Sequence, residues 1–453
     1  MLSLVRKLIP PFLLSWYHLG LAFLGALIFR FPSQGMVVIG ITGTNGKSTT
    51  VDMLSRIFRE AGRKTASLSS IRFQILDKEW RNTMKMTMPG RFVIQKFLRQ
   101  AKDAGCTHFV LEVTSEGILQ HRHRFINFHT AVFTNLSPEH IERHGSFENY
   151  KRAKGKLFQM VKRVHVINAD DEHAPFFLQF PAEEKSLYSS NPEFSFGPGA
   201  IFNARRGGLA KSPVEAKQLA STPTSATRMQ KIQSSRISEN ENGLDFQIDD
   251  IAFHLNLLGR FNVSNALAAI SVVRSLGISL QACRDALEKM QVVPGRMETV
   301  AQEPFLVVVD YAFTPAALEK VYQTLKPKKG KLICILGAAG GGRDKWKRPV
   351  LGKLAATYCD QVIITNEDPY EEDPQKIIDE VAAGAEKSAV LKILDRREAI
   401  RKGLSLASSG DTVVITGKGS EDCIQIQGGK KIPWDDREVV REEMRNVIIS
   451  FRN

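Results

Sequence analysis

The clearest chemical signal lies in residues 36–50, which read MVVIGITGTNGKSTT. An apolar run leads through a glycine-rich turn into a stretch typical of a helix, and this order is the one a phosphate-binding loop requires. Glycines let backbone N–H groups approach phosphate oxygens, and the start of a helix adds a positive dipole. Lys47 would place a charge at the β- and γ-phosphates, and the Ser48 hydroxyl could ligate Mg²⁺. Because the usual first glycine of the pattern is replaced by Ile41, we interpret the loop as a variant.

Two other side chains follow apolar runs of the same kind. Glu112 ends the run in VLEVTSEG, and His140 follows a second run in FTNLSPEH. The carboxyl ends of parallel strands form the ligand-binding edge of an α/β sheet, where an oxygen and an imidazole nitrogen could meet a nucleotide-bound Mg²⁺. Taken singly, either residue fits an ordinary polar strand end, which spacing alone favours over a metal ligand. The basic run at 150–156 by itself indicates a solvated helix face.

The elements that must position these residues follow an alternating pattern. Short apolar runs alternate with helical stretches, which predicts an α/β fold: a P-loop central domain with a mostly parallel sheet, followed by a Rossmann-like α/β domain after a Pro-Gly boundary at 294–295. We therefore expect an apolar N-terminal segment at 1–35, a central ATP-binding domain at 36–296 and a C-terminal domain at 297–453. The polar stretch at 205–236 is interpreted as a loop or insertion. Strands are expected at 36–41, 108–113, 130–135, 163–168, 306–310, 331–336, 361–365, 390–394 and 412–416, and helices at 47–61 and 91–104.

The start of the chain has a different character. Residues 8–29 carry no Asp, Glu, Lys or Arg and are bracketed by Arg6, Lys7 and Arg30. A helix that begins after the two prolines would be roughly 27 Å long, which barely matches a hydrocarbon core of ~30 Å. The segment is compatible both with membrane contact and with packing onto the next domain.

Composition restricts the class of protein. The 453 residues are 43% hydrophobic and 24% charged, a globular mixture rather than a disordered or fibrous one. The five cysteines form no C-x-x-C pair, so a disulfide framework or a cysteine zinc site is not expected, and a reducing cytoplasm fits best. The net charge of +14 favours anionic partners such as nucleotides, phosphorylated substrates or a membrane surface. No nucleic-acid-binding module is present, so nucleic acid is not an expected partner.

With these stretches taken together, the chain resembles the Mur ligase family, most closely the UDP-N-acetylmuramoyl-tripeptide synthetases. The likeness covers about residues 36–453, and the matching blocks are GTNGKSTT (43–50), MTMPGRF (86–92), EVTSEGILQHR (112–122), AVFTNLSPEHIERHGSFENYKRAKGKLF (131–158), VINADDE (166–172), LLGRFNVSNALAAI (257–270), PGRME (294–298), VDYAFTP (309–315), GGGRDKWKRP (340–349) and GKGSE (417–421). The resemblance implies an ATP-dependent ligase of peptidoglycan precursor synthesis. In such a ligase an acceptor carboxylate takes the γ-phosphoryl group of ATP, and the amine of an amino acid then displaces phosphate from the acyl phosphate.

The resemblance also implies roles for individual residues. The nucleotide would be bound by Gly43, Thr44, Asn45, Gly46, Lys47, Ser48, Thr49, Asn135, Asn265, Arg296 and Asp310. Magnesium would be held by Ser48, Glu112 and His140, and supported by Lys154 as a carbamate, which replaces the solvated-face interpretation for that lysine. Lys47, Lys154 and His140 would be the catalytic residues. The muramoyl-peptide acceptor would contact Thr87, Ser115 and Arg122, and the amino acid would contact Arg343, Asp368, Gly417 and Glu421.

The sequence departs from the family pattern in three ways. Residues 367–370 read E-D-P-Y where the diaminopimelate-adding enzymes have D-N-P-R, which argues against diaminopimelate as the amino acid. Three family imidazoles are replaced, by Glu116, Phe313 and Ser420. The phosphate loop also begins so early that the usual N-terminal uridine-binding domain is expected to be absent, so that a partner subunit or a lipid carrier of the acceptor would take its place. Rival interpretations are a related ligase acting on another carboxylate (a non-murein wall peptide, a polyglutamate or a folate) and a non-catalytic nucleotide-binding scaffold.

Overall fold

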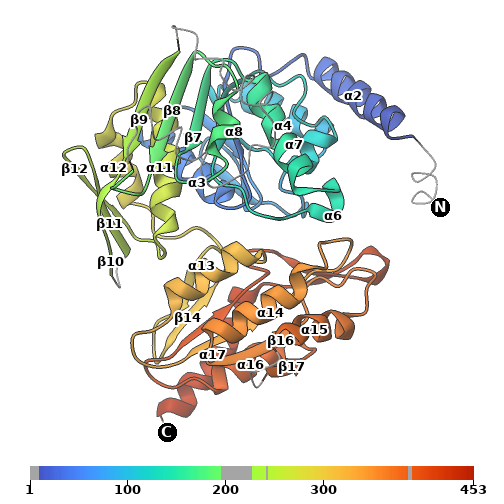
Figure 1. The fold of residues 1–453 in the computed structure, drawn as a ribbon, viewed down its shortest axis with the longest axis vertical. Coiled ribbons are helices and arrows are strands. Elements are labelled where there is room, and N and C mark those ends of the chain that lie inside the picture. The colour runs from blue at the N-terminus through green and yellow to red at the C-terminus, as the bar shows by residue number, and fades with distance from the viewer. Residues whose placement is uncertain (1–9, 195–226, 241–242, 386–389, 453) are drawn as a thin grey trace, which may run out of the picture. The chain divides into compact units, whose positions relative to one another are not determined.

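The computed structural model describes residues 10–194, 227–240, 243–385 and 390–452 (Figure 1). These residues form two compact units that are not divided at a single point of the chain. Unit 1 takes in residues 1–136, 148–255 and 262–290, and unit 2 takes in residues 137–147, 256–261 and 291–453. Each unit has its own sheet and its own helices.

Unit 1 is built on a nine-stranded sheet in the order β4-β3-β2-β5-β1-β6-β7-β8-β9. β3 and β4 pair antiparallel at one edge, and from β2 to β9 all neighbours run parallel. The central strand β1 is almost wholly buried and apolar, as expected for a parallel sheet that is covered on both faces. The strands are β1 (Val37–Thr42), β2 (Thr65–Leu68), β3 (Arg72–Ile75), β4 (Lys78–Arg81), β5 (His108–Glu112), β6 (Phe128–Phe133), β7 (Val164–Asn168), β8 (Glu184–Ser189) and β9 (Arg228–Gln233).

Helices connect these strands, and a small antiparallel sheet follows them. The helices of unit 1 are α2 (Pro11–Ile28), α3 (Lys47–Glu60), α4 (Arg91–Asp103), α5 (Ser115–Leu119), α7 (Phe147–Met160), α8 (Ala174–Leu178), α11 (Phe261–Ser275) and α12 (Leu280–Glu288). The small sheet has the order β10-β11-β12, with β10 (Ser235–Asn240), β11 (Gly243–Ile248) and β12 (Ile251–Leu255). The predicted loop at 205–236 is wrong for its last part, because β9 and the start of β10 lie there. The remainder, at 205–226, lies outside the described residues.

Unit 2 is a six-stranded sheet in the order β13-β14-β18-β15-β16-β17, in which only β13 pairs antiparallel. The strands are β13 (Glu298–Ala301), β14 (Leu306–Val309), β15 (Leu332–Leu336), β16 (Gln361–Thr365), β17 (Val390–Ile393) and β18 (Thr412–Ile415), with a separate hairpin of β19 (Cys423–Ile426) and β20 (Lys430–Pro433). The helices are α6 (Ile141–His144), α13 (Pro315–Leu325), α14 (Lys347–Tyr358), α15 (Pro374–Ala382), α16 (Arg396–Ser405) and α17 (Asp436–Arg452), with short 3-10 turns at Ala383–Ala385 and Gln427–Gly429.

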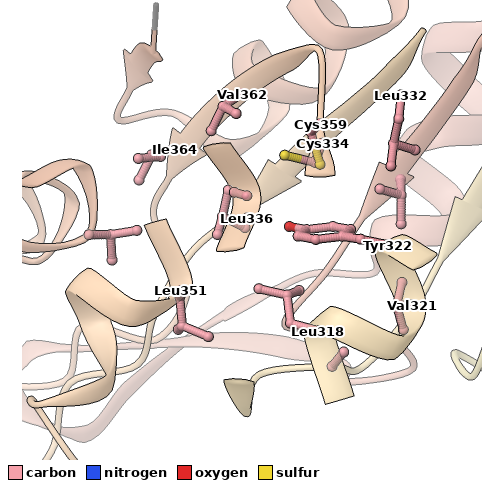
Figure 2. Close-up of a cluster of buried hydrophobic side chains, with 14 of the residues drawn as sticks. Leu318, Val321, Tyr322, Leu332, Cys334, Leu336, Leu351, Cys359, Val362 and Ile364 are labelled. Carbon is pink, nitrogen blue, oxygen red and sulfur yellow. The ribbon is translucent and has the colours of Figure 1, made fainter. Parts of the chain in front are cut away.

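Alternate residues of each strand fill two cores, one on each face of the unit 2 sheet. In β15, Leu332, Cys334 and Leu336 pack against α13 and α14, whereas Ile333 and Ile335 belong to the second core with residues of α16 and α17. Figure 2 shows the first core, in which the α13 side chains approach β15. This period of two is the pattern of a sheet covered by helices on both faces. The predicted α/β class, with large and mainly parallel sheets, is confirmed.

Helix α2 lies at the periphery of unit 1 and packs against α4 (Figure 1). Its buried side includes His18, Ala22 and Ala26. Within the described parts of the chain, no helix combines the length and the apolar character needed to cross a membrane. The helix packs onto the domain, as one of the two predictions had it.

Candidate active site

The glycine-rich loop joins the carboxyl end of β1 to the start of α3, as predicted. Gly46 precedes α3 with φ 82° and ψ −12°, a left-handed conformation that favours glycine. A Cβ atom at this position would lie 2.2 Å from the Asn265 Oδ1 atom, so the space also requires glycine. The Lys47 ammonium curls back and donates to the carbonyl oxygens of Gly43 at 3.1 Å and Thr44 at 2.8 Å. The Lys47 side chain therefore lies over the turn that the loop forms.

Side chains from the end of β6 hold this loop in place. The Asn135 side chain accepts from the Asn45 backbone N–H at 2.9 Å and donates to the Asn45 carbonyl oxygen at 3.0 Å. Thr134 donates to the same carbonyl oxygen at 2.7 Å. The Thr44 hydroxyl is 3.1 Å from the Tyr150 hydroxyl of α7. In this structure Asn135 therefore stabilises the loop, while Asn265 lies against Gly46.

The structure brings Ser48 and Glu112 together through a residue that the sequence analysis did not single out. The Ser48 hydroxyl lies 2.7 Å from the Ser70 hydroxyl, and the Ser70 backbone N–H donates to the Glu112 carboxylate at 3.1 Å. Glu112 is 1% exposed. A hydroxyl and a carboxylate are hard oxygen ligands that suit Mg²⁺, which commonly binds through one or two protein oxygens together with substrate phosphates. No group of three or more His, Cys, Asp and Glu that could hold a metal occurs in the described ranges. Ser48 and Glu112 fit an ion that nucleotide phosphates also bind.

Lys154 is buried on α7, close to the phosphate loop. Its ammonium donates to the Gly43 carbonyl oxygen at 2.7 Å and lies 4.6 Å from the centre of the Tyr150 ring. Burial, followed by the positive charge of Lys47, lowers the pKa of Lys154 well below its ordinary value. The structure therefore brings Lys154 to the loop and contradicts a solvated position for this lysine.

His140 belongs to a segment, residues 137–147, that packs with unit 2 rather than unit 1. The Asp344 carboxylate accepts from the backbone N–H groups of Ile141 and Glu142, both at 3.0 Å. Lys347 donates to Glu139 at 2.7 Å, and both side chains are almost fully buried. His140 itself has φ 57°, which is uncommon for a residue other than glycine. The residues on both sides of His140 are thus tied to the start of α14.

The three expected acceptor residues lie around Met88. Thr87 precedes it, and the Arg122 guanidinium donates to the Met88 carbonyl oxygen. Arg122 also donates to the Gln120 side chain at 2.7 Å. Ser115 is the buried first residue of α5, and a Cβ on Gly117, two residues later, would lie 2.3 Å from the Met88 sulfur atom. The segment at 86–92 and the start of α5 therefore form one packed group.

The residues expected to bind the substrate amino acid lie in unit 2 around Lys418, another residue that the sequence analysis missed. The fully buried Lys418 ammonium donates to Asp368 at 2.7 Å and to Glu421 at 2.6 Å. Gly417 precedes it with φ 104°, and a Cβ there would lie 2.8 Å from a Glu367 oxygen. Burial raises the pKa of this Glu367 carboxyl, and the neighbouring charge of Asp368 adds to the rise.

Arg343 and Tyr370 lie at the border of the same group. Burial raises the pKa of Tyr370, and the charge of Arg343 opposes this rise, so the guanidinium is within electrostatic range of the ring. A Cβ at Gly341 would lie 2.6 Å from the Tyr370 ring. The ring that replaces the family arginine therefore occupies space directly beside the glycine-rich turn at 340–342.

The two residues of unit 2 that are expected to bind the nucleotide lie close to this group. The Arg296 guanidinium lies 4.1 Å from the centre of the Tyr311 ring, and the Tyr311 hydroxyl donates to Glu421 at 3.2 Å. Asp310 accepts from the backbone N–H groups of Met297 at 2.7 Å and Ala312 at 2.6 Å. Burial raises the pKa of Asp310, and the charge of Arg296 opposes the rise.

Comparison with known proteins accounts for both units. The profile of the Mur ligase middle domain matches residues 41–273, and that of the Mur ligase glutamate ligase domain matches residues 295–419. A UDP-N-acetylmuramyl-tripeptide synthetase of Roseiflexus sp. (strain RS-1) is 34% identical over 467 residues, which cover 97% of this chain and 84% of that protein. The chain belongs to the Mur ligase family. It is accordingly an ATP-dependent ligase that forms carbon–nitrogen bonds, which confirms the predicted class of enzyme.

Solved structures support the same fold for this Mur ligase. A structure of UDP-N-acetylmuramoyl-L-alanyl-D-glutamate–2,6-diaminopimelate ligase is 30% identical, with a TM-score of 0.57, and the match covers 92% of this chain and 79% of that one. The folylpolyglutamate synthase of Mycobacterium tuberculosis is 19% identical, with a TM-score of 0.64, and the match covers 88% of this chain and 92% of that one. The second likeness shows a shared fold only.

Local signals could have pointed to some of the residues that were missed in this Mur ligase. Ser70 follows β2 as Glu112 ends β5, so it lies at the same edge of a parallel sheet, where polar residues bind ligands. Lys418 lies between two glycines in GKGSE, the block that matched the family. No comparable signal distinguishes Lys347 from the other basic residues near it.

Proposed function

We propose that this Mur ligase adds an amino acid to a muramoyl-peptide acceptor in peptidoglycan precursor synthesis, at the cytoplasmic side of the membrane. The observation that carries the proposal is the loop at 43–49 with Lys47 over the turn and Lys154 against the Gly43 carbonyl oxygen. The names of the relatives and the packed acceptor segments at 86–92 and 112–122 support the choice of acceptor.

In the first chemical step, a carboxylate oxygen of the acceptor attacks the γ-phosphorus of ATP, and ADP leaves. The amine nitrogen of the amino acid then attacks the acyl carbon, loses a proton, and phosphate leaves. Lys47 offers a positive charge for the oxygens of the transferred group, and the backbone N–H groups at the start of α3 bind the phosphate chain. The protein therefore contributes alignment and neutralisation of charge.

Magnesium fits the oxygen ligands of Ser48 and Glu112, and the family resemblance implies His140 as a further ligand. When bound, it would neutralise phosphate charge. Lys154 is suited to the carbamate role, because burial lowers the pKa of its amine and so favours the neutral form that reacts with carbon dioxide. The Gly43 carbonyl oxygen orients this side chain toward the loop.

For the amino acid, we propose a substrate other than diaminopimelate, held near Arg343, Asp368, Gly417 and Glu421. Tyr370 offers no positive charge for a distal carboxylate, and its ring lies beside Gly341. Arg296 and Asp310 are proposed to reach the nucleotide together with Asn135 and Asn265. Between the two expected partners, a lipid surface and a partner subunit, the exposed apolar side of α2 favours lipid contact.

The test is amino-acid-dependent release of phosphate by the purified full chain. ATP and Mg²⁺ are combined with uridine-linked or lipid-linked muramoyl-dipeptide and with each amino acid in turn, and the product mass identifies the pair. We expect turnover with one amino acid, and we expect Lys47→Ala to abolish it while exposed Lys64→Ala does not. Nucleotide binding without phosphate release on any acceptor would favour the scaffold alternative, and turnover only with a folate or polyglutamate would favour the related ligases.

A further inference from the structure

Helix α2 has one buried side and one exposed side, and the exposed side is entirely apolar. Its exposed positions recur every three or four residues, which is the spacing of a single helix face. Trp16 is 70% exposed and Tyr17 59% exposed. Of the seventeen exposed large apolar side chains in the described residues, seven lie on this helix: Leu13, Trp16, Tyr17, Phe23, Leu24, Leu27 and Ile28. A continuous exposed patch of this kind marks a surface that contacts something else.

The buried side ties α2 to the proposed acceptor site. The Ser15 hydroxyl lies 2.8 Å from the His121 ring nitrogen. The Arg91 guanidinium bridges the His18 ring, at 2.8 Å, and the Gln120 carbonyl oxygen, at 3.2 Å. Gln120 in turn binds Arg122. Because polar side chains fix α2 to both acceptor segments, the orientation of its apolar side is set relative to that site.

The chain around this helix is basic and carries no acidic residue over three stretches. Residues 1–51, 80–102 and 117–138 contain no Asp or Glu, and the exposed basic residues of these stretches include Arg30, Lys96 and Arg124. His121, whose ring lies 2.8 Å from the Ser15 hydroxyl of α2, is within electrostatic range of Arg124, Lys156 and Arg91, whose charges add to burial in lowering its pKa. A patch surrounded by one sign of charge complements a surface of the opposite sign.

We propose that the exposed side of α2 docks this Mur ligase on an anionic lipid surface. The helix lies along the interface rather than across it, with Trp16 and Tyr17 at the level of the lipid headgroups. A lipid surface is the better match, because an apolar helix face with Trp, Phe and Leu beside Lys and Arg has the composition of an interfacial helix. The inference rests on the proposed function in one respect: docking would bring the acceptor site to the membrane, where a lipid-linked muramoyl peptide is presented.

The experiment is co-sedimentation of the purified full chain with vesicles of phosphatidylcholine alone or with about one third phosphatidylglycerol. We expect binding to the anionic vesicles that weakens as salt is raised. The variant Leu24→Glu/Leu27→Glu should bind at least tenfold less. Its matched control is Leu391→Glu/Leu394→Glu, which makes the same change at similarly exposed leucines in unit 2 and should bind like the unchanged chain.

Three results would overturn the proposal. The first is absence of binding to vesicles, and the second is an equal loss of vesicle binding in the two double variants. The third is a soluble oligomer of the unchanged chain that becomes monomeric in Leu24→Glu/Leu27→Glu, which would make α2 an interface between copies. Circular dichroism establishes that both variants fold. Turnover on a water-soluble acceptor should be the same in all three proteins. Loss of docking with normal turnover refutes only this inference, and docking without turnover on any acceptor refutes only the proposed function.

Discussion

Replacement of Lys347 by methionine should release the segment that carries His140. The Lys347 ammonium and the Glu139 carboxylate are 2.7 Å apart, and their side chains are 4% and 3% exposed. Removing one partner of such a pair leaves a buried charge without compensation, at a cost of about 3–5 kcal/mol. Glu139 would then move toward water and take the adjacent residues with it.

The free-energy cost of this substitution can be measured by hydrogen exchange at two backbone amides. Ile141 and Glu142 donate their N–H groups to Asp344, so their hydrogen exchange reports opening of the segment. A loss of about 3 kcal/mol corresponds to exchange that is roughly a hundredfold faster. The double variant Lys347→Met/Glu139→Gln leaves no buried charge and should recover most of the protection. Lys345→Met is the matched control, because its ion pair with Glu372 is half exposed and worth at most about 1 kcal/mol.

The functional measurement is the Mg²⁺ concentration that gives half-maximal phosphate release. We expect a higher requirement in Lys347→Met, with a smaller change in the double variant and none in Lys345→Met. Equal exchange rates in Lys347→Met and Lys345→Met would refute the reasoning, because the buried pair would then not hold the segment. Faster exchange without any change in the Mg²⁺ requirement would separate the segment from metal binding.

Two further predictions concern unit 1. Gly46→Ala should abolish the thermal stabilisation by ATP and Mg²⁺, because the new Cβ would lie 2.2 Å from the Asn265 Oδ1 atom. The control is Gly62→Ala, which is also at positive φ but has no atom within 4 Å of the new Cβ, and it should keep the stabilisation. Equal effects of the two substitutions would contradict the steric argument. Burial lowers the pKa of His123 to about 3, so its contribution to stability is complete above pH 6.5 and falls as the pH falls toward 3. The free energy of unfolding, measured with urea, should fall between pH 7 and pH 5 by about 2 kcal/mol less in His123→Phe than in the unchanged chain. An identical pH dependence of the two proteins would show that this ring is not buried in its uncharged form.

The parts of the fold that could be predicted are those with local causes. The apolar runs of β1, β5 and β18 are long enough to identify buried strands, and the turn before Lys47 has the residue types that its geometry needs. β9 and β10 were missed because each lies at the edge of its sheet, where polar side chains are exposed and no apolar run forms. The local pattern was then typical of a loop.

The candidate site also contains residues that local sequence predicts and contacts that it does not. The loop residues could be predicted from spacing, but the contact of Ser48 with Ser70 depends on the order of β2, β5 and β1 in the sheet, which spacing does not contain. The Lys347–Glu139 pair joins residues 208 positions apart. Such a pair is specified by tertiary packing, so no reading of nearby sequence could distinguish this lysine from its neighbours.

The chain crosses between its two units five times, at 136–137, 147–148, 255–256, 261–262 and 290–291. Severing it at the last junction would leave a fragment in which residues 137–147 keep Glu139 but lose Lys347 and Asp344. The halves are therefore not interchangeable modules that evolution or an engineer could swap by recombination at one point. A chimaera that exchanges residues 291–453 should carry residues 137–147 and 256–261 along with them.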